Sequence, residues 1–288
     1  MFSRSQIKEI ANEIWNLSDE TVDLESFCER KLKEFHPGIS DLEIADDIDK
    51  LASQVKRQLD NKITSFRGKG VPPNFEFDDY LPYVLCRHRS NNDNNDWVIA
   101  LRKYRNDIKS SIKNMDAIAF EHLCKHVLEI NGIIKSFVTR PTKEGGVDFY
   151  GLLEMCNYTQ GVLLNNMKLR IIGQAKHRSG DEKVGEKEID EIRTKYSDFQ
   201  SGQGTAIKVL PDWFTKTCTP VICIVITTTD FTRGARESAE RDGIILRDGD
   251  QITEDIIHSP RLNEWFHTDK DGNRIFNQQL FLRSFSAI

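Results

Sequence analysis

The chain has 288 residues, 30% of them charged, and a formal net charge of −5, which fits a water-soluble protein with two domains of ordinary size. No apolar run approaches the ~20 residues of a membrane helix, and the first residues lack the apolar segment of a secretory signal. Six scattered cysteines form no C-x-x-C pair, so zinc spacing and a disulfide framework are not expected. We therefore expect a cytoplasmic protein without a membrane partner.

The charge is unevenly distributed along the chain. Residues 1–50 carry 6 basic and 13 acidic side chains, residues 51–115 carry 12 and 7, and residues 116–288 carry 22 and 25. The net charge alone therefore neither favours nor excludes a nucleic-acid partner. The basic middle segment has two interpretations, a phosphate-binding surface or a counterpart of the acidic first fifty residues. Its candidate residues are Lys56-Arg57, Arg87-His-Arg89 and Arg102-Lys-Tyr-Arg105.

Residues 1–115 are predicted to form an all-α domain. A capping box, Ser40-Asp-Leu-Glu43, starts a helix whose apolar residues recur at steps of three and four from Ile44 to Ile63. The stripe indicates a bundle core, with self-association as the alternative. Pro72-Pro73 ends this helical region, and a further helical segment follows the polar loop at 90–96.

The pattern changes at residue 116, where Asp116 is placed to cap a helix that stops at Asn131-Gly132. The order of elements that follows is αβββαβαβ, which predicts an α/β sandwich over 116–252. A C-terminal extension, 253–288, is expected to pack back on it through its aromatic residues. The strands are predicted at 133–139, 147–156, 168–176, 221–227 and 244–246, and the later helices at 186–200 and 232–242.

Four polar residues of this region form a candidate site. Asp148 starts the second strand after two glycines, and Gln174 and Lys176 end the third strand on one face, because strand side chains alternate. Glu121 lies at the rim of the apolar stripe of the first helix. Oxygen ligands for a divalent cation, together with a lysine beside them, are what hydrolysis of a phosphodiester requires.

At these residues the chain resembles the Mrr-like branch of the PD-(D/E)xK restriction endonucleases. That branch carries a glutamine in place of the acidic residue before the lysine. The resemblance implies a restriction-endonuclease-like αβββαβαβ core. It departs from the family in the turn before the glycines, whose first position often carries an acidic residue. Here that region reads Thr142-Lys143-Glu144. The matching segments are 145–148, 174–176, 184–186, 226–240 and 244–249.

The resemblance also implies ligands for Mg²⁺, with Mn²⁺ as a substitute. Asp148 would be the main ligand and the Gln174 side chain a weaker, neutral one. The carbonyl of Ala175 would add a further oxygen. Glu121 would bind the metal directly or support the groups that do.

Lys176 would orient the attacking water and offset charge in the transition state. The backbone phosphates of DNA would be contacted by residues on either side of the site, His177, Arg178 and Lys143.

The implied function is a metal-dependent endodeoxyribonuclease of a restriction or phage-defence system, acting as a homodimer or higher homo-oligomer. The N-terminal region would recognise DNA, sense a defence-system partner protein or build the oligomer. Two alternatives stay open. One is an inactive nuclease fold that binds DNA or acts as a scaffold, which the neutral Gln174 makes worth keeping. The other is a repair or junction-resolving nuclease.

Two further patterns favour ordinary structure. His122 and His126 are four apart on the helix after Asp116, a spacing that suits zinc, but no third ligand is near in sequence, so both are interpreted as surface residues. The run Asp269-Lys-Asp-Gly272 is interpreted as a turn, because it lacks the glutamate that closes a calcium loop.

Overall fold

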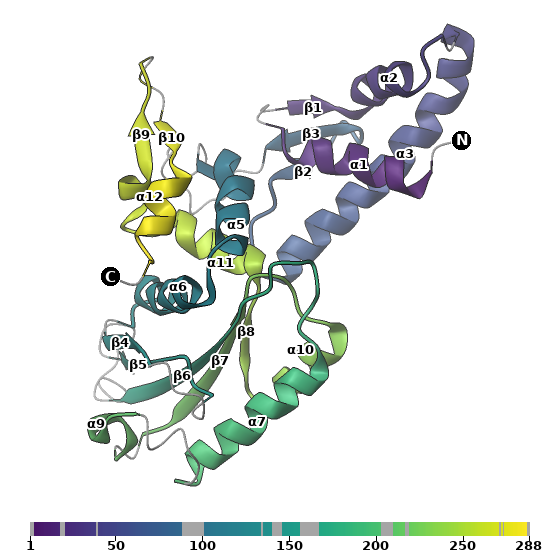
Figure 1. Cartoon of the computed structure of the whole chain (residues 1–288). Coiled ribbons are helices and arrows are strands. Elements are labelled where there is room, and N and C mark those ends of the chain that lie inside the picture. Colours follow the sequence, from purple (N-terminus) through teal and green to yellow (C-terminus); the bar gives the residue numbers. More distant parts are fainter. Residues whose placement is uncertain are drawn as a thin grey trace. The chain divides into compact units, whose positions relative to one another are not determined.

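The computed structural model describes residues 3–17, 21–38, 40–87, 101–133, 135–139, 146–155, 167–202, 210–216, 219–270, 272 and 274–286. The chain separates into two compact units, Met1–Asn106 and Asp107–Ile288, each with its own hydrophobic core (Figure 1). Within the described ranges no helix is both long and apolar enough to cross a membrane.

The first unit contains the predicted helical region. Its helices are α1 (Arg4–Trp15), α2 (Leu24–Phe35) and α3 (Asp41–Gly68). Ser40 and Glu43 form the predicted capping box at the start of α3. The apolar stripe of α3 packs into the core with α1 and α2, so the interpretation of this stripe as a bundle core is confirmed. Its buried members are Ile44, Leu51, Val55, Leu59 and Ile63.

Three short strands accompany these helices, which the sequence did not indicate. They are β1 (Thr21–Asp23), β2 (Phe75–Phe77) and β3 (Val84–Arg87), antiparallel in the order β1-β3-β2. Strands of three or four residues are too short to display a period of two, which is why the pattern was missed.

The basic residues of this unit are largely engaged in its own structure. Arg102 and Arg105 are only 4% and 3% exposed. Arg105 donates hydrogen bonds to the carbonyl of Pro72, at 3.0 Å, and to the Asn74 side chain. Arg87 donates to a backbone carbonyl and lies over an aromatic ring. The prediction of an open phosphate-binding surface is therefore wrong for Arg102 and Arg105. Arg89 lies outside the described residues.

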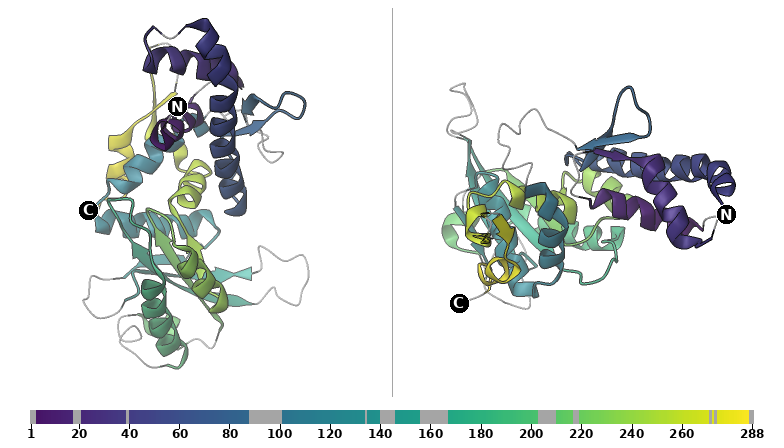
Figure 2. Two further views of the ribbon diagram at one scale, coloured as in Figure 1. Left: turned by 90° about the vertical axis from the view of Figure 1, so that its right-hand side faces the viewer. Right: turned by 90° about the horizontal axis from the view of Figure 1, so that it is seen from above.

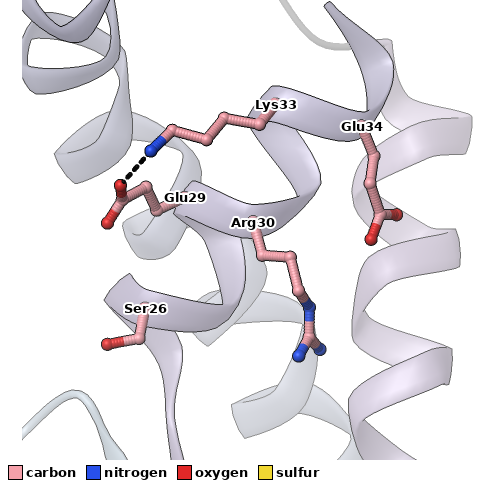
Figure 3. Close-up of a pocket in the computed structure, with 5 residues that line it drawn as sticks. All are labelled: Ser26, Glu29, Arg30, Lys33 and Glu34. Atoms are coloured by element: carbon pink, nitrogen blue, oxygen red, sulfur yellow. Dashed lines mark hydrogen bonds and ion pairs between the residues drawn. The ribbon is translucent and has the colours of Figure 1, made fainter. Parts of the chain in front are cut away.

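The outer face of α2 carries charges of both signs around an open hollow (Figure 3). Lys33 Nζ lies 2.7 Å from Glu29 Oε1, four residues earlier on the helix. Arg30 lies with its guanidinium over the Phe27 ring. Mixed charges paired at this spacing are typical of a solvated helix face.

The second unit is built on one five-stranded mixed sheet, in the order β4-β5-β6-β7-β8. The pairs β4–β5 and β5–β6 are antiparallel, whereas β6–β7 and β7–β8 are parallel. This arrangement is the mixed α/β fold predicted from the sequence. The strands are β4 (Lys135–Val138), β5 (Phe149–Glu154), β6 (Lys168–Lys176), β7 (Val221–Thr227) and β8 (Ile245–Arg247).

Helices cover both faces of this sheet (Figure 1, Figure 2). On one face lie α6 (Ala117–Ile130) and α11 (Gly249–Ile257). On the other lie α7 (Glu186–Gln200) and α10 (Arg233–Arg241), whose apolar residues share a core with β5, β6 and β7. Two shorter helices complete this part, α5 (Arg105–Lys113) and α9 (Asp212–Thr215).

The sequence sets the position of α6 closely. Asp116 accepts a hydrogen bond from the Ala119 amide at 2.7 Å, and Gly132 ends the helix with a positive φ of 83°. The predicted buried stripe is confirmed, with Phe120, Leu123, Cys124, Val127 and Leu128 all inside.

A glycine in β6 is required by packing. Gly173 lies opposite Phe149 on β5, and a Cβ at position 173 would come within 2.0 Å of the Phe149 ring. The aromatic ring thus lies over the glycine and fixes the start of β5 against β6.

The C-terminal residues pack against α6. This segment contains a 3₁₀ turn (Leu262–Trp265), the hairpin β9 (Phe266–Thr268) with β10 (Arg274–Phe276), and α12 (Gln278–Arg283). The Trp265 ring lies 6.1 Å from the His126 ring, measured between centroids.

This packing corrects the interpretation of His126 as a surface residue. His126 is 4% exposed, and its Nε2 lies 2.8 Å from Ser259 Oγ. The face of α6 away from the sheet is covered by residues more than a hundred positions later, which a local pattern does not reveal.

Candidate active site

Asp148 lies where β5 and β6 begin to separate. Its amide donates to the Gly173 carbonyl at 2.9 Å, and its Oδ2 accepts a hydrogen bond from the Ala175 amide at 2.8 Å. On the other side, the Thr139 amide donates to the Asp148 carbonyl at 2.9 Å. The carboxylate is therefore held by backbone, and its Oδ1 has no hydrogen-bond donor among the described residues.

Glu121 comes close enough to Asp148 for the two charges to interact. Burial, and then the negative charge of Asp148, raise the pKa of Glu121 to about 7. Burial also raises the pKa of Asp148, against the opposing effects of the Ala175 amide and two lysines. Two carboxylates held near one another in a partly buried place destabilise each other's charged form, and a bound cation would relieve this.

Gln174 contributes a side-chain oxygen that is placed to bind a cation. Its side-chain oxygen, Oε1, is buried and accepts no hydrogen bond from any residue that the structure describes. A buried carbonyl oxygen without a donor costs free energy, on the order of 1–3 kcal/mol. A divalent cation is a natural partner, because amide and carboxylate oxygens are the ligands that Mg²⁺ and similar ions prefer. The residues present thus fit a bound metal ion.

The acidic part of the site is small. In the part of the chain that the structure describes, no three His, Cys, Asp or Glu side chains gather into a metal-binding group. A metal here would rely on two carboxylates, the Gln174 side chain and backbone oxygen such as the Ala175 carbonyl.

Beside these groups an open pocket of about 320 Å³ lies between the first turns of α6 and the end of β6. Glu121 and Lys176 both line it. Its other lining residues are Ala117, Phe120, Ala175, His177 and Arg178.

The two residues after the lysine have partners within the protein. His177 Nε2 lies 3.2 Å from the Lys113 carbonyl oxygen. Arg178 forms an ion pair with Glu188 on α7, and its amide donates to Thr228 Oγ1 at 2.9 Å. Both residues line the pocket, so a phosphate contact from either would compete with these interactions. Lys143, predicted with them, lies outside the described residues.

One residue near Asp148 was missed at the level of the sequence. Lys195 on α7 lies over Gly146, and its charge, like that of Lys176, lowers the pKa of Asp148. In the sequence this lysine follows a helical glutamate by four residues, which is the pattern of an ordinary surface pair.

Comparison with known proteins gives one family match and several partial structural similarities. Residues 112–222 match the model of a family described as restriction endonuclease, Mrr_cat. A search of curated proteins found no significant match.

Among solved structures the chain is similar to the MspJI restriction endonuclease in complex with a 27-mer oligonucleotide, with 17% identity and a TM-score of 0.41 over 71% of this chain and 41% of that one. The DNA modification-dependent restriction endonuclease AspBHI is 15% identical, with a TM-score of 0.38 over 68% of this chain and 43% of that one. The restriction endonuclease FokI is 11% identical, with a TM-score of 0.37 over 88% of this chain and 44% of that one. The chain thus spans less than half the length of these structures.

The family match covers β4, β5, β6 and α7, and it includes Glu121, Asp148, Gln174 and Lys176. Residues 112–222 are therefore similar to the Mrr_cat family of restriction endonucleases.

Proposed function

We propose that the chain is a divalent-metal-dependent endodeoxyribonuclease that uses Mg²⁺, or Mn²⁺ in its place, and hydrolyses DNA within a restriction or phage-defence system. The observation that carries the proposal is the buried, unpartnered oxygen of Gln174 beside the backbone-held carboxylate of Asp148. The match of residues 112–222 to the restriction endonuclease family model supports the substrate class and the reaction.

In this proposal Asp148, Gln174, Glu121 and the Ala175 carbonyl hold the metal. When bound, the cation would polarise the scissile phosphate and make the attacking water more acidic. Because one Asp148 oxygen is fixed by the Ala175 amide, the other is left to bind without reorganisation.

Lys176 acts on the reacting groups. Its ammonium donates a hydrogen bond that orients the water and offsets the negative charge that builds on phosphorus. The water oxygen forms the new bond to phosphorus and gives up a proton to solvent. The bond to the leaving sugar oxygen breaks, and that oxygen takes up a proton from solvent.

The rest of the chain has proposed roles as well. Residues 116–252 would form the nuclease domain, residues 253–288 an extension that packs on it, and residues 1–115 a region for DNA recognition, partner sensing or oligomer formation. Cleavage of both strands needs two active sites, so we propose a homodimer or higher homo-oligomer acting in the cytoplasm.

A plasmid assay tests the function. The full chain is incubated with methylated and unmethylated supercoiled plasmid, in Mg²⁺ or in EDTA. We expect nicked or linear products that need the metal, and a difference between the two plasmids would reveal dependence on methylation. Plasmid binding without cleavage in Mg²⁺ and in Mn²⁺ would instead favour an inactive DNA-binding fold. Preference for branched over linear duplex would favour a junction-resolving nuclease.

A further inference from the structure

The side chain of Lys195 packs against the backbone of Gly146, two residues before Asp148. Its φ is +62°, a conformation that L side chains rarely adopt. A Cβ built at this position would lie 2.4 Å from Lys195 Nζ and 2.5 Å from Lys195 Cδ. The stem and ammonium of Lys195, from α7, therefore occupy the space that any other residue at 146 would fill.

Lys195 does not make the ion pair that its helix offers. Glu191 precedes it by four residues, the spacing and order that favour a Glu–Lys pair. Lys33, Lys125 and Lys216 each pair with an acidic residue four positions away. Over the described ranges neither Glu191 nor Lys195 forms an ion pair, although Lys195 is exposed. Its ammonium instead points toward the glycine beside the active site.

Two lysines from different elements thus flank Asp148. Lys176 ends β6, and Lys195 lies on α7 against the backbone of Gly146, two residues before Asp148. The helix covers this face of the sheet, because Ile172, two residues before Gln174, packs in the core beneath it. A divalent cation bound to the Asp148 carboxylate would offset its negative charge, and both ammonium groups would then be available to another anion.

We propose that Lys195 binds a non-bridging phosphate oxygen of the DNA strand at the active site, on the α7 side, as a second cation beside Lys176. This role rests on the nuclease function proposed above. Gly146 serves it by leaving room for the lysine stem.

DNA binding, measured without cleavage, tests this role. The full chain and its K195Q, K195R and K187Q variants are titrated onto a labelled duplex in Ca²⁺, at several salt concentrations. Lys187 is the matched control, since it is exposed on the same helix and has no ion pair with a described residue. We expect K195Q to weaken binding about tenfold and to reduce the salt slope by about 1. K195R should retain most of the affinity, and K187Q should match the wild type within twofold.

The results separate the inference from the function on which it rests. Wild-type binding that K195Q retains, with an unchanged salt slope, would overturn the role of Lys195 alone. An increase in Ca²⁺ affinity in K195Q with no change in DNA binding would also overturn it, because Lys195 would then only neutralise Asp148. Absence of DNA binding by the wild type would overturn both proposals. G146A, whose Cβ displaces the lysine, should reproduce the K195Q salt slope if the protein remains folded.

Discussion

At the scale of single residues, the site combines carboxylates whose pKa values are raised with an amide oxygen that has no hydrogen-bond partner among the described residues. Glu121 is the most perturbed of these groups, with a pKa near 7. Its neighbour Asp148 is held more firmly, by the Ala175 amide. A cation-binding site at this position would explain both observations.

Glu121 predicts a pH dependence of stability without metal. Its folded pKa of about 7 exceeds the ordinary value of 4.5, so the folded state binds the proton more tightly. Stability should therefore fall as the pH rises from about 4.5 to about 7, and stay lower above that. E121Q should remove this loss. In EDTA at pH 8 we expect its Tm to exceed the wild-type value by about 2–4 °C. This shift corresponds to a gain of about 1 kcal/mol in the free energy of unfolding, after allowance for solvent screening.

The control for Glu121 is the same comparison at pH 5, where the two proteins should melt within about 1 °C of each other. Thermal melts of both proteins at both pH values are sufficient. An equal gain in Tm at pH 5 and at pH 8 would show that the carboxyl group of Glu121 does not titrate as described.

Gln174 gives a second residue-scale prediction. If its oxygen is a neutral ligand, Q174E adds a charged ligand at the same place, so metal affinity should rise by up to about tenfold and cleavage should be retained. Calorimetric titration with Mn²⁺ and a plasmid assay measure both. Normal folding with complete loss of cleavage would indicate that Gln174 contacts the substrate instead.

At the scale of elements, the site depends on how β5 meets β6. Phe149 lies over Gly173. Asp148 directly precedes Phe149, and Gln174 directly follows Gly173. The contact is non-local, because Phe149 begins β5 whereas Gly173 lies near the far end of β6. Precise placement of the two polar side chains thus depends on a hydrophobic contact next to them.

Enlarging Gly173 should disturb this placement. In G173A the new methyl group would overlap the Phe149 ring, so we expect a loss of about 1–3 kcal/mol in the free energy of unfolding. The control is G180A, at an exposed position where a Cβ would have no neighbour closer than 4.0 Å. Denaturant unfolding compares the two. Equal stability of G173A and G180A would mean that the ring moves away without cost.

Elements with a long, regular pattern could be predicted from the sequence. The helix 186–200 and the strands 168–176 and 221–227 agree with α7, β6 and β7 to the residue. The sequence did not indicate α11 or the small N-terminal sheet, because their apolar patterns are short. Gln174 and Lys176 could be predicted on one side of the sheet because they end a regular strand, where side chains alternate.

Long-range packing limited the rest. His126 is buried because the C-terminal segment covers it, and Arg105 because it reaches Asn74. Lys195 was missed since Glu191, four residues earlier, offered a sufficient local explanation. Each of these depends on a partner that the local pattern does not contain.

At the scale of the whole molecule, one chain of 33.2 kDa supplies one proposed active site. Cleavage of a duplex on both strands needs two such sites, so we expect association, at least on DNA. Sedimentation velocity of the full chain, alone and with a duplex in Ca²⁺, measures this. We expect a species with two chains per duplex. A single chain per duplex at all protein concentrations would argue for a nicking enzyme.

The measurement that tests the central claim most directly pairs D148A with K176A, following plasmid cleavage in Mg²⁺ and Mn²⁺ binding by calorimetry on the same preparations. We expect both variants to fold and to lose cleavage by at least about 10³-fold. D148A should also lose metal binding, whereas K176A should bind metal at least as tightly as the wild type, because a cation beside the ligands has been removed. Cleavage at the wild-type rate by either folded variant would contradict the assignment of the active site.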